Sequence, residues 1–174
     1  EALRTSGGST PYKILIVRRL KGDSQMRIIV NVLIVLVFFA EMGMSQTNKE
    51  MAIRVLDEFL AHFNNQDYKA VAETFHYPHV RIARGKVFVW NSPEDFLAAR
   101  TPEDIARHVT ATGWHHTKWD TRKVIQNGAN KIHIAVQFTR YREDGSVIGR
   151  YDSFYIVTKK DGRWGIQARS SFLP

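Results

Sequence analysis

The sequence predicts an α+β fold in which a curved antiparallel sheet with four long meander strands wraps around N-terminal helices, giving a cone-shaped α+β barrel. Three turn dipeptides lie seventeen residues apart near the C-terminus: Asn127-Gly128, Asp144-Gly145 and Asp161-Gly162. Asn-Gly and Asp-Gly favour β-hairpins because glycine adopts positive φ without a Cβ clash. The segments between these turns are rich in Ile, Val, Phe, Tyr and Thr, and strands of this length twist and curl. An amphipathic helix pattern upstream supplies a helix for the concave face.

The first helix is predicted from a capping-box pattern, Thr47 to Glu50, that directly precedes an apolar stripe. The stripe has helical spacing and consists of Ala52, Val55, Leu56, Phe59, Leu60 and Phe63. A second, shorter helix capped by Asp67 is expected to bury Phe75. We expect it to end at Pro78, because proline disfavours the helical conformation in the residue before it.

Two short strands are predicted at residues 80–83 and 87–90, followed by two helix starts of the same kind. The sequence reads Ser-Pro-Glu-Asp at residues 92–95 and Thr-Pro-Glu-Asp at residues 101–104. Each start combines a hydroxyl N-cap, proline at the first helical position and acidic residues that suit the helix dipole. Gly113 is expected to end the second of these helices, just before the long sheet.

The composition limits the classes of function. A length of 174 residues suits one domain and a tail, and the absence of cysteine excludes disulfides, thiolate metal sites and a cysteine nucleophile. The net charge is +8, but beyond residue 46 the basic residues are dispersed. Nucleic-acid binding, which favours a dense basic stripe with exposed aromatic residues, is therefore not predicted.

Residues 26–45 have the pattern of a secretory signal peptide. Arg27 precedes the apolar run of residues 28–40, and Gly43 and Ser45 are small residues two apart, as a signal peptidase needs. The run is short for a bilayer span of about 20 residues. We therefore expect a periplasmic or secreted protein without a stable membrane anchor; the alternative is a single-pass anchored protein in which the segment is not cleaved.

A signal peptide belongs at an N-terminus, so we expect Met26 to be the natural start. Residues 1–25 would then be a non-native or read-through extension. The alternative is a genuine extension with a short apolar strand at residues 14–17. Cleavage after the signal peptide would leave residues 46–174 as a single domain that begins at Gln46.

Two sequence cues connect this order of elements to a known superfamily. Residues 161–166 read D-G-R-W-G-I, and residues 64–68, after the first helix, read N-N-Q-D-Y before the segment that runs into Phe75. With the helix and strand order, these cues resemble the nuclear-transport-factor-2-like superfamily, which includes the SnoaL-like polyketide cyclases and ketosteroid isomerase. The resemblance spans about residues 48–173.

The resemblance implies a sheet wrapped around the first helix, a mainly apolar pocket at one end of the cone, and dimers formed through the outer sheet face. Some members are isomerases, cyclases, dehydratases or epoxide hydrolases, and others bind without catalysis. The fold therefore does not give the function.

The isomerase-type members place an acidic general base on the short strand after the second helix, but residues 78–84 contain no Asp or Glu. A histidine would have to take that role. His79 and His116 are the candidate catalytic residues, with Arg81 as an anion clamp. The competing interpretation is that His76 caps the second helix and His79 makes only a strand-edge hydrogen bond. No spacing motif supports a zinc site from the three histidines, so no metal or cofactor is predicted.

The candidate ligand-binding residues are those expected near the mouth of the pocket or along its walls. They are His76, Arg81, Trp90, Tyr151, Arg169 and Ser170. Whether Arg169 or Ser170 reaches the pocket depends on a bulge that would shift the register of the last strand.

Two functions remain open. The first is an exported domain that binds a small apolar or aromatic ligand and acts as a cofactor-free isomerase, cyclase, lyase or hydrolase of the SnoaL-like type. The second is a non-catalytic binding or dimerisation module of the same fold. In both, apolar residues on the two faces of the third long strand favour a homodimer.

Overall fold

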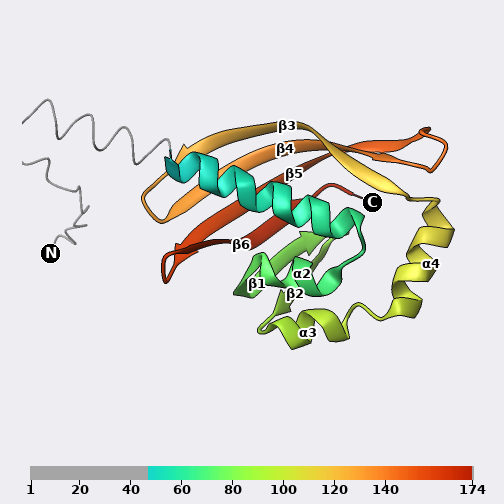
Figure 1. Ribbon diagram of the computed structural model, residues 1–174, viewed down its shortest axis with the longest axis horizontal. Coiled ribbons are helices and arrows are strands. Elements are labelled where there is room, and N and C mark those ends of the chain that lie inside the picture. The colour runs from blue at the N-terminus through green and yellow to red at the C-terminus, as the bar shows by residue number, and fades with distance from the viewer. Residues whose placement is uncertain (1–46, 174) are drawn as a thin grey trace, which may run out of the picture. The chain divides into compact units, whose positions relative to one another are not determined.

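The computed structural model describes residues 47–173 (Figure 1). A long N-terminal helix covers residues 47–64. The other helices are α2 (Tyr68–Glu73), α3 (Pro93–Ala98) and α4 (Pro102–Thr112). The strands are β1 (Phe75–Ala83), β2 (Lys86–Trp90), β3 (His116–Asn127), β4 (Lys131–Tyr141), β5 (Val147–Lys160) and β6 (Arg163–Ser171).

The predicted extension (residues 1–25) and signal peptide (residues 26–45) lie outside the described residues, so both stay predictions. No helix within residues 47–173 has the length and apolar character needed to cross a membrane.

The six strands form one sheet in the order β2-β1-β6-β5-β4-β3. Every neighbouring pair is antiparallel except β1 and β6, which run parallel. Figure 1 shows the long strands curving beneath the N-terminal helix, and the sheet does not close. The predicted meander of four long strands and the α+β fold class are confirmed.

The core lies between the N-terminal helix and the concave face of the sheet. Its buried members come from the helical stripe and from the inward faces of three strands: Ala52, Val55, Leu56, Phe59, Ile132, Ile134, Tyr155, Val157, Trp164 and Ile166. The Phe59 ring centroid lies 5.9 Å from that of Phe75 and 6.0 Å from that of Tyr155. Burying such side chains stabilises a fold by about 1.5–3 kcal/mol each, which is what holds the helix against the sheet.

The predicted end of the second helix at Pro78 is wrong, because α2 ends at Glu73 with Thr74 as its C-cap. The Ile166 amide donates to the Thr74 carbonyl (2.9 Å), and Phe75 is the register partner of Ile166. Pairing with β6 thus draws the chain into a strand before proline can act on the helix. His76 is consequently a strand residue, and its interpretation as a helix cap is also wrong.

The two predicted helix starts are confirmed. The Ser92 hydroxyl accepts from the Asp95 amide, and the Thr101 hydroxyl accepts from the Asp104 amide, each at 3.2 Å. Gly113 ends α4 with φ of 64°, a left-handed conformation that suits glycine. Together α3 and α4 carry the chain from β2 at one edge of the sheet to β3 at the other. The link between them brings Arg100 over the open end of the sheet.

Candidate functional site

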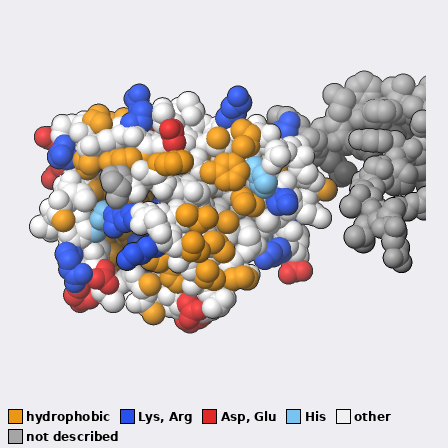
Figure 2. Space-filling model, turned by 180° about the vertical axis from the view of Figure 1, so that it is seen from behind, with side chains coloured by type: hydrophobic (Ala, Val, Ile, Leu, Met, Phe, Trp, Pro, Cys, Tyr) orange, Lys and Arg blue, Asp and Glu red, His pale blue; other side chains and the backbone are white. Residues whose placement is uncertain are grey.

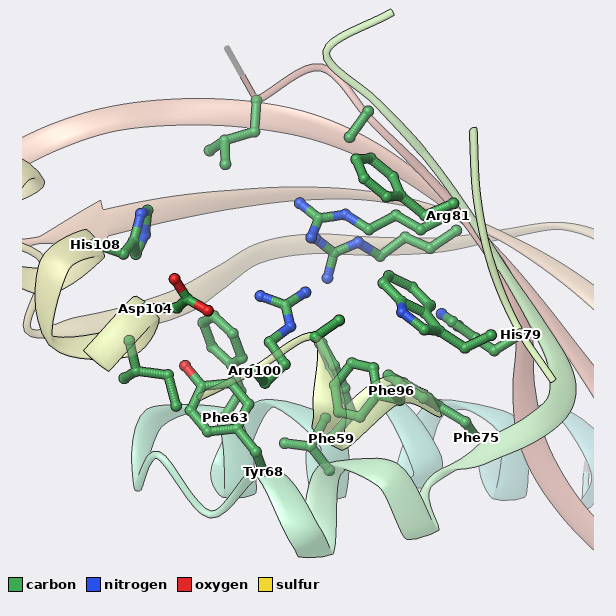
Figure 3. Close-up of a pocket in the computed structure, with 18 of the residues that line it drawn as sticks. Phe59, Phe63, Tyr68, Phe75, His79, Arg81, Phe96, Arg100, Asp104 and His108 are labelled. Atoms are coloured by element: carbon green, nitrogen blue, oxygen red, sulfur yellow. The ribbon is translucent and has the colours of Figure 1, made fainter. Parts of the chain in front are cut away.

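A cavity of about 190 Å³ opens between the N-terminal helix, β1, β2, β6 and the helices α3 and α4 (Figure 3). Aromatic and basic side chains provide most of its lining. The aromatic members are Phe59, Phe63, Tyr68, Phe75, Phe88, Trp90 and Phe96, and the basic members are His79, Arg81, Arg84, Arg100, His108, Arg140 and Arg169.

One wall of the cavity is a stack of rings from β1 and β2. The His79 ring lies parallel to Phe75, with centroids 3.8 Å apart, and is also stacked with Trp90 at 5.8 Å. Trp90 in turn stacks with Phe88 at 5.9 Å. Phe96 from α3 meets Phe75 and Trp90 edge-on, at 5.1 and 5.4 Å. Flat aromatic walls of this kind favour flat apolar ligands.

His79 is buried, with 3% of its surface exposed, and its Nδ1 lies 3.0 Å from the Ile166 carbonyl oxygen. A carbonyl only accepts, so Nδ1 carries the proton of the neutral ring. Burial lowers the pKa of His79 to about 4, and the positive charges of Arg169 and Arg81 act in the same direction. His79 is therefore neutral at pH 7, and a base with this pKa accepts protons weakly there.

Four arginines of the lining, Arg81, Arg100, Arg140 and Arg169, form what we call the arginine cluster. Within residues 47–173 the ion pairs are Arg107–Asp104, Arg122–Asp57 and Arg150–Asp120. None of them includes a member of the cluster. The Nε atoms of all four are buried and have no hydrogen-bond partner in the described part of the chain. Buried polar groups are normally paired, so this group calls for an explanation.

The members of the cluster act on one another electrostatically. Arg81 on β1 is the register partner of Arg169 on β6, and the charge of Arg169, followed by burial, lowers the pKa of Arg81 to about 8. Burial and then Arg169 lower the pKa of Arg140 to about 10, and the same two causes lower the pKa of Arg100. Arg169 is thus the centre of the mutual repulsion.

Aromatic rings hold two of these guanidinium groups in place. Arg100 lies 5.3 Å from the Phe96 ring centroid, and Arg169 lies 5.7 Å from that of Phe59 and 5.6 Å from that of Tyr155. Cation–π contacts attract a cation but do not neutralise its charge. The cluster stays positive with its side chains fixed.

Among the described residues, one carboxylate, that of Asp104, also lines the cavity. Its Oδ1 accepts from Arg107 at 2.8 Å and its Oδ2 accepts from the Thr101 hydroxyl at 3.1 Å. His108 Nε2 lies 3.4 Å from Arg140 Nη1, and burial followed by the charge of Arg140 lowers the pKa of His108. His108 is therefore neutral at pH 7 and adds no positive charge, and among the described lining residues the positive charges of the arginines still exceed the negative charge of Asp104.

A smaller cavity of about 20 Å³ adjoins the first and shares Phe59, Phe63, Arg140 and Arg169 with it. Trp119 lines this extension, and its indole Nε1 is buried without a hydrogen-bond partner. A space of this size holds about one water molecule or a small polar substituent. It offers an additional donor beyond the arginine cluster.

Four of the residues predicted for the site line the cavity: His79, Arg81, Trp90 and Arg169. The other four do not. His76 Nδ1 lies 2.8 Å from the Thr158 hydroxyl, and the His116 ring stacks on Tyr141 with centroids 5.0 Å apart. Tyr151 packs against Phe138, and the carbonyl of Ser170 accepts from the Ser153 hydroxyl. Within residues 47–173, no group of three His, Asp or Glu side chains is arranged to hold a metal ion.

Most of the lining was missed by the sequence analysis, and the basic residues among those missed are Arg84, Arg100, His108 and Arg140. A signal for Arg140 was present, because it continues the inward alternation of β4 after Val136 and Phe138. Arg100 lies in a short link between two helices, where no periodicity indicates which side chains face the sheet.

The NTF2-like protein family (DUF6841) matches residues 49–171. An NTF2-like protein with a cystatin-like fold from Novosphingobium aromaticivorans superposes with a TM-score of 0.63 at 13% identity, covering 79% of this chain and 89% of that chain. A ketosteroid isomerase-like protein from Erwinia carotovora atroseptica gives a TM-score of 0.51 at 19% identity, covering 72% and 96%.

A protein from Catenulispora acidiphila, solved in complex with S-DNPA, gives a TM-score of 0.57 at 10% identity, covering 73% of this chain and 93% of that chain. At these identities the structural likeness shows the fold alone. The search of curated proteins gave no significant match. The family match covers most of the chain, and the chain therefore belongs to the NTF2-like protein family DUF6841.

Proposed function

We propose that residues 47–173 form a small-molecule-binding domain whose ligand places a flat, apolar or aromatic body against the ring stack of His79, Trp90 and Phe88. The observation that carries this proposal is the cavity of about 190 Å³ walled by those rings. Ligand pockets for drug-sized molecules span about 300–1,000 Å³. A smaller space suits a ligand with one ring and short substituents.

Similar proteins support a ligand in this fold. The Catenulispora acidiphila protein has been solved in complex with S-DNPA, so one structural neighbour holds a small molecule. A second structural neighbour is described as ketosteroid isomerase-like. Neither neighbour identifies the ligand of this chain. The residues that line the cavity are the evidence for its chemical class.

Catalysis by His79 is the second candidate function. The observation that favours catalysis is the hydrogen bond from His79 Nδ1 to the Ile166 carbonyl, because it leaves Nε2 as the unprotonated nitrogen of the neutral ring. A pKa of about 4 argues against a strong general base. His116 stacks on Tyr141 outside the cavity, so a shared role with His79 requires a substrate that extends beyond it. We therefore place binding before catalysis.

Thermal-shift and fluorescence titrations with the neutral compounds indole and benzamide test the binding proposal. We expect both compounds to raise the melting temperature and benzamide to quench tryptophan emission, because Trp90 lines the cavity; indole, which fluoresces itself, is followed by the thermal shift alone. Trp90→Leu should weaken binding, while Phe154→Leu should leave it unchanged, because Phe154 packs on His133 away from the cavity. Equal binding by the parent protein and Trp90→Leu would place the ligand elsewhere.

We also propose that the protein is exported, on the basis of the signal-peptide pattern of residues 26–45. Edman sequencing of the protein recovered from its native host should then begin near Gln46. A mature protein that retains residues 26–45 would contradict cleavage and favour the membrane-anchored alternative.

A homodimer is proposed as well. On the face seen in Figure 2, hydrophobic side chains gather into broad areas with Lys and Arg side chains around them. The exposed apolar side chains of β1 and β2 outside the cavity lining include Ile82, Val87 and Val89. Contiguous apolar surface of this kind marks interaction sites. Sedimentation velocity should give twice the monomer mass; a monomer at micromolar concentration would refute the dimer.

A further inference from the structure

We propose that the ligand of this cavity carries at least two negative charges on carboxylate or phosphate oxygens, held by the arginine cluster, next to its flat apolar body. The inference rests on the proposed function, because it concerns the same cavity. It specifies the chemical class of the ligand: a small aromatic or apolar dianion.

The charge balance of the lining is the first argument. Over residues 47–173, the four guanidinium groups of the arginine cluster share the cavity with one carboxylate, that of Asp104. Both oxygens of that carboxylate already accept hydrogen bonds, from Arg107 and Thr101. An excess of buried positive charge without partners is costly, and proteins normally pair such groups. An anionic ligand supplies the missing partner.

The cluster differs from Arg163, an arginine with a structural role, in its hydrogen bonds. Arg163 donates from Nη1 to the Glu73 carbonyl at 2.9 Å and from Nη2 to the Phe75 carbonyl at 2.7 Å, which ties β6 to the end of α2. The four Nε atoms of the cluster have no such acceptor. Arg140 is 7% exposed and makes its one side-chain contact at hydrogen-bond distance with His108. In the part of the chain that the structure describes, the Nε atoms of the cluster thus have none of the carbonyl acceptors that hold Arg163 in place.

The third argument concerns the number of charges. Arg81 and Arg169 project from adjacent strands as register partners, and Figure 3 shows the side chain of Arg100 directed toward Arg81 from the opposite side of the cavity. One carboxylate is satisfied by one or two guanidinium groups. Four guanidinium groups thus match two carboxylates or one phosphate dianion, and a single carboxylate leaves repulsion unrelieved.

Calorimetric titration of the full chain with four compounds tests the inference. The compounds are terephthalate, phenyl phosphate, benzoate and benzamide, which share one ring and differ in charge. We expect the two dianions to bind at least about tenfold more tightly than benzamide, since charge-assisted hydrogen bonds contribute about 1.5–3 kcal/mol. Benzoate should be intermediate, and the advantage of the dianions should shrink at high ionic strength. The tighter of the two dianions distinguishes a dicarboxylate from a phosphate ester.

Charge-removing variants locate the site. Arg169→Gln and Arg81→Gln should each lose about tenfold in affinity for the dianions and keep the affinity for benzamide. Arg54→Gln, which removes the same charge from an exposed position of the N-terminal helix, should change neither. Without ligand, Arg169→Gln should melt at a higher temperature than the parent protein, because it relieves repulsion; a structural arginine would give a lower melting temperature.

Each outcome decides one of the two proposals. Dianions that bind no more tightly than benzamide would overturn the charge inference and leave the aromatic pocket standing. Full dianion affinity in both arginine variants would also overturn the inference. Failure of all four compounds to bind would overturn the proposed function together with it. Should Arg169→Gln not fold, Arg81→Gln provides the same comparison.

Discussion

Acidification is predicted to destabilise this protein through His79. The pKa of His79 is 6.5 in the unfolded chain and about 4 in the fold, where burial and the charges of Arg169 and Arg81 oppose protonation. Below about pH 6.5 the unfolded chain binds a proton that the native state refuses. The free energy of unfolding is therefore unaffected by His79 above that pH and falls as the pH drops toward 4. At about 1.4 kcal/mol per pH unit, the loss is about 3 kcal/mol.

Urea denaturation between neutral pH and about pH 4, with the variant His79→Phe, isolates this contribution. Phenylalanine keeps the stack with Phe75 and Trp90 but cannot be protonated. It also removes the donor to the Ile166 carbonyl, so stability at neutral pH should fall by about 1–3 kcal/mol. The decline of stability on acidification should be about 3 kcal/mol smaller in the variant than in the parent protein.

The relevant quantity is the difference in free energy of unfolding between the parent protein and His79→Phe at each pH, because other groups also titrate in this range. His76, whose pKa is lowered to about 4 mainly by burial, contributes to both curves. Parallel curves for the parent protein and His79→Phe would refute the argument.

Three further substitutions test the packing. Gly165→Ala would place a Cβ 2.8 Å from Cδ2 of the buried His76 ring and should cost about 1–3 kcal/mol in urea denaturation. Leu56→Ala removes a fully buried side chain of the N-terminal helix and should cost about 2–5 kcal/mol by the same measurement. Thr101→Ala removes the N-cap acceptor for the Asp104 amide and should cost about 1 kcal/mol in thermal melts followed by circular dichroism.

Each of these has a result that would contradict it. Parent-like stability in Gly165→Ala would mean that the His76 ring moves aside without cost. A loss below about 1 kcal/mol in Leu56→Ala would mean that the helix does not pack on the sheet as described. An unchanged melt for Thr101→Ala, with Thr110→Ala on the exposed side of α4 as control, would show that the first turn of α4 does not depend on its cap.

The fold could be predicted from the sequence where local signals and tertiary structure agree. The turns at Gly128, Gly145 and Gly162 separate the four long strands. Two helices begin where a hydroxyl N-cap, Ser92 or Thr101, is followed by a proline. Gly145 and Gly162 adopt the expected positive φ and Gly128 does not; the other signals specify the conformation of the residues that carry them. Such signals do not depend on how the rest of the chain packs.

The predictions from sequence were wrong or left open where the pairing of strands far apart in the sequence determines the structure. Phe75 and Pro78 belong to a strand because β1 pairs with β6, which no local pattern indicates. The inward direction of Arg169 depends on a register shift between β5 and β6, where Ala168 pairs with Ile156 and Ile166 pairs with the next residue, Val157. The extra residue, Gln167, reverses the alternation, so Arg169 joins the cavity. Sequence alternation alone cannot locate such a bulge.

The parallel pairing of β1 with β6 also has a consequence for the order of folding. His79 and its partner Ile166 are 87 residues apart in the sequence, and the hairpins of β3 to β6 form between near neighbours. Contacts of long sequence separation form slowly, because a large loop must close first. We therefore expect the pairing of β1 with β6 to form after these hairpins, and substitutions in β6 to slow the appearance of ligand binding more than that of secondary structure.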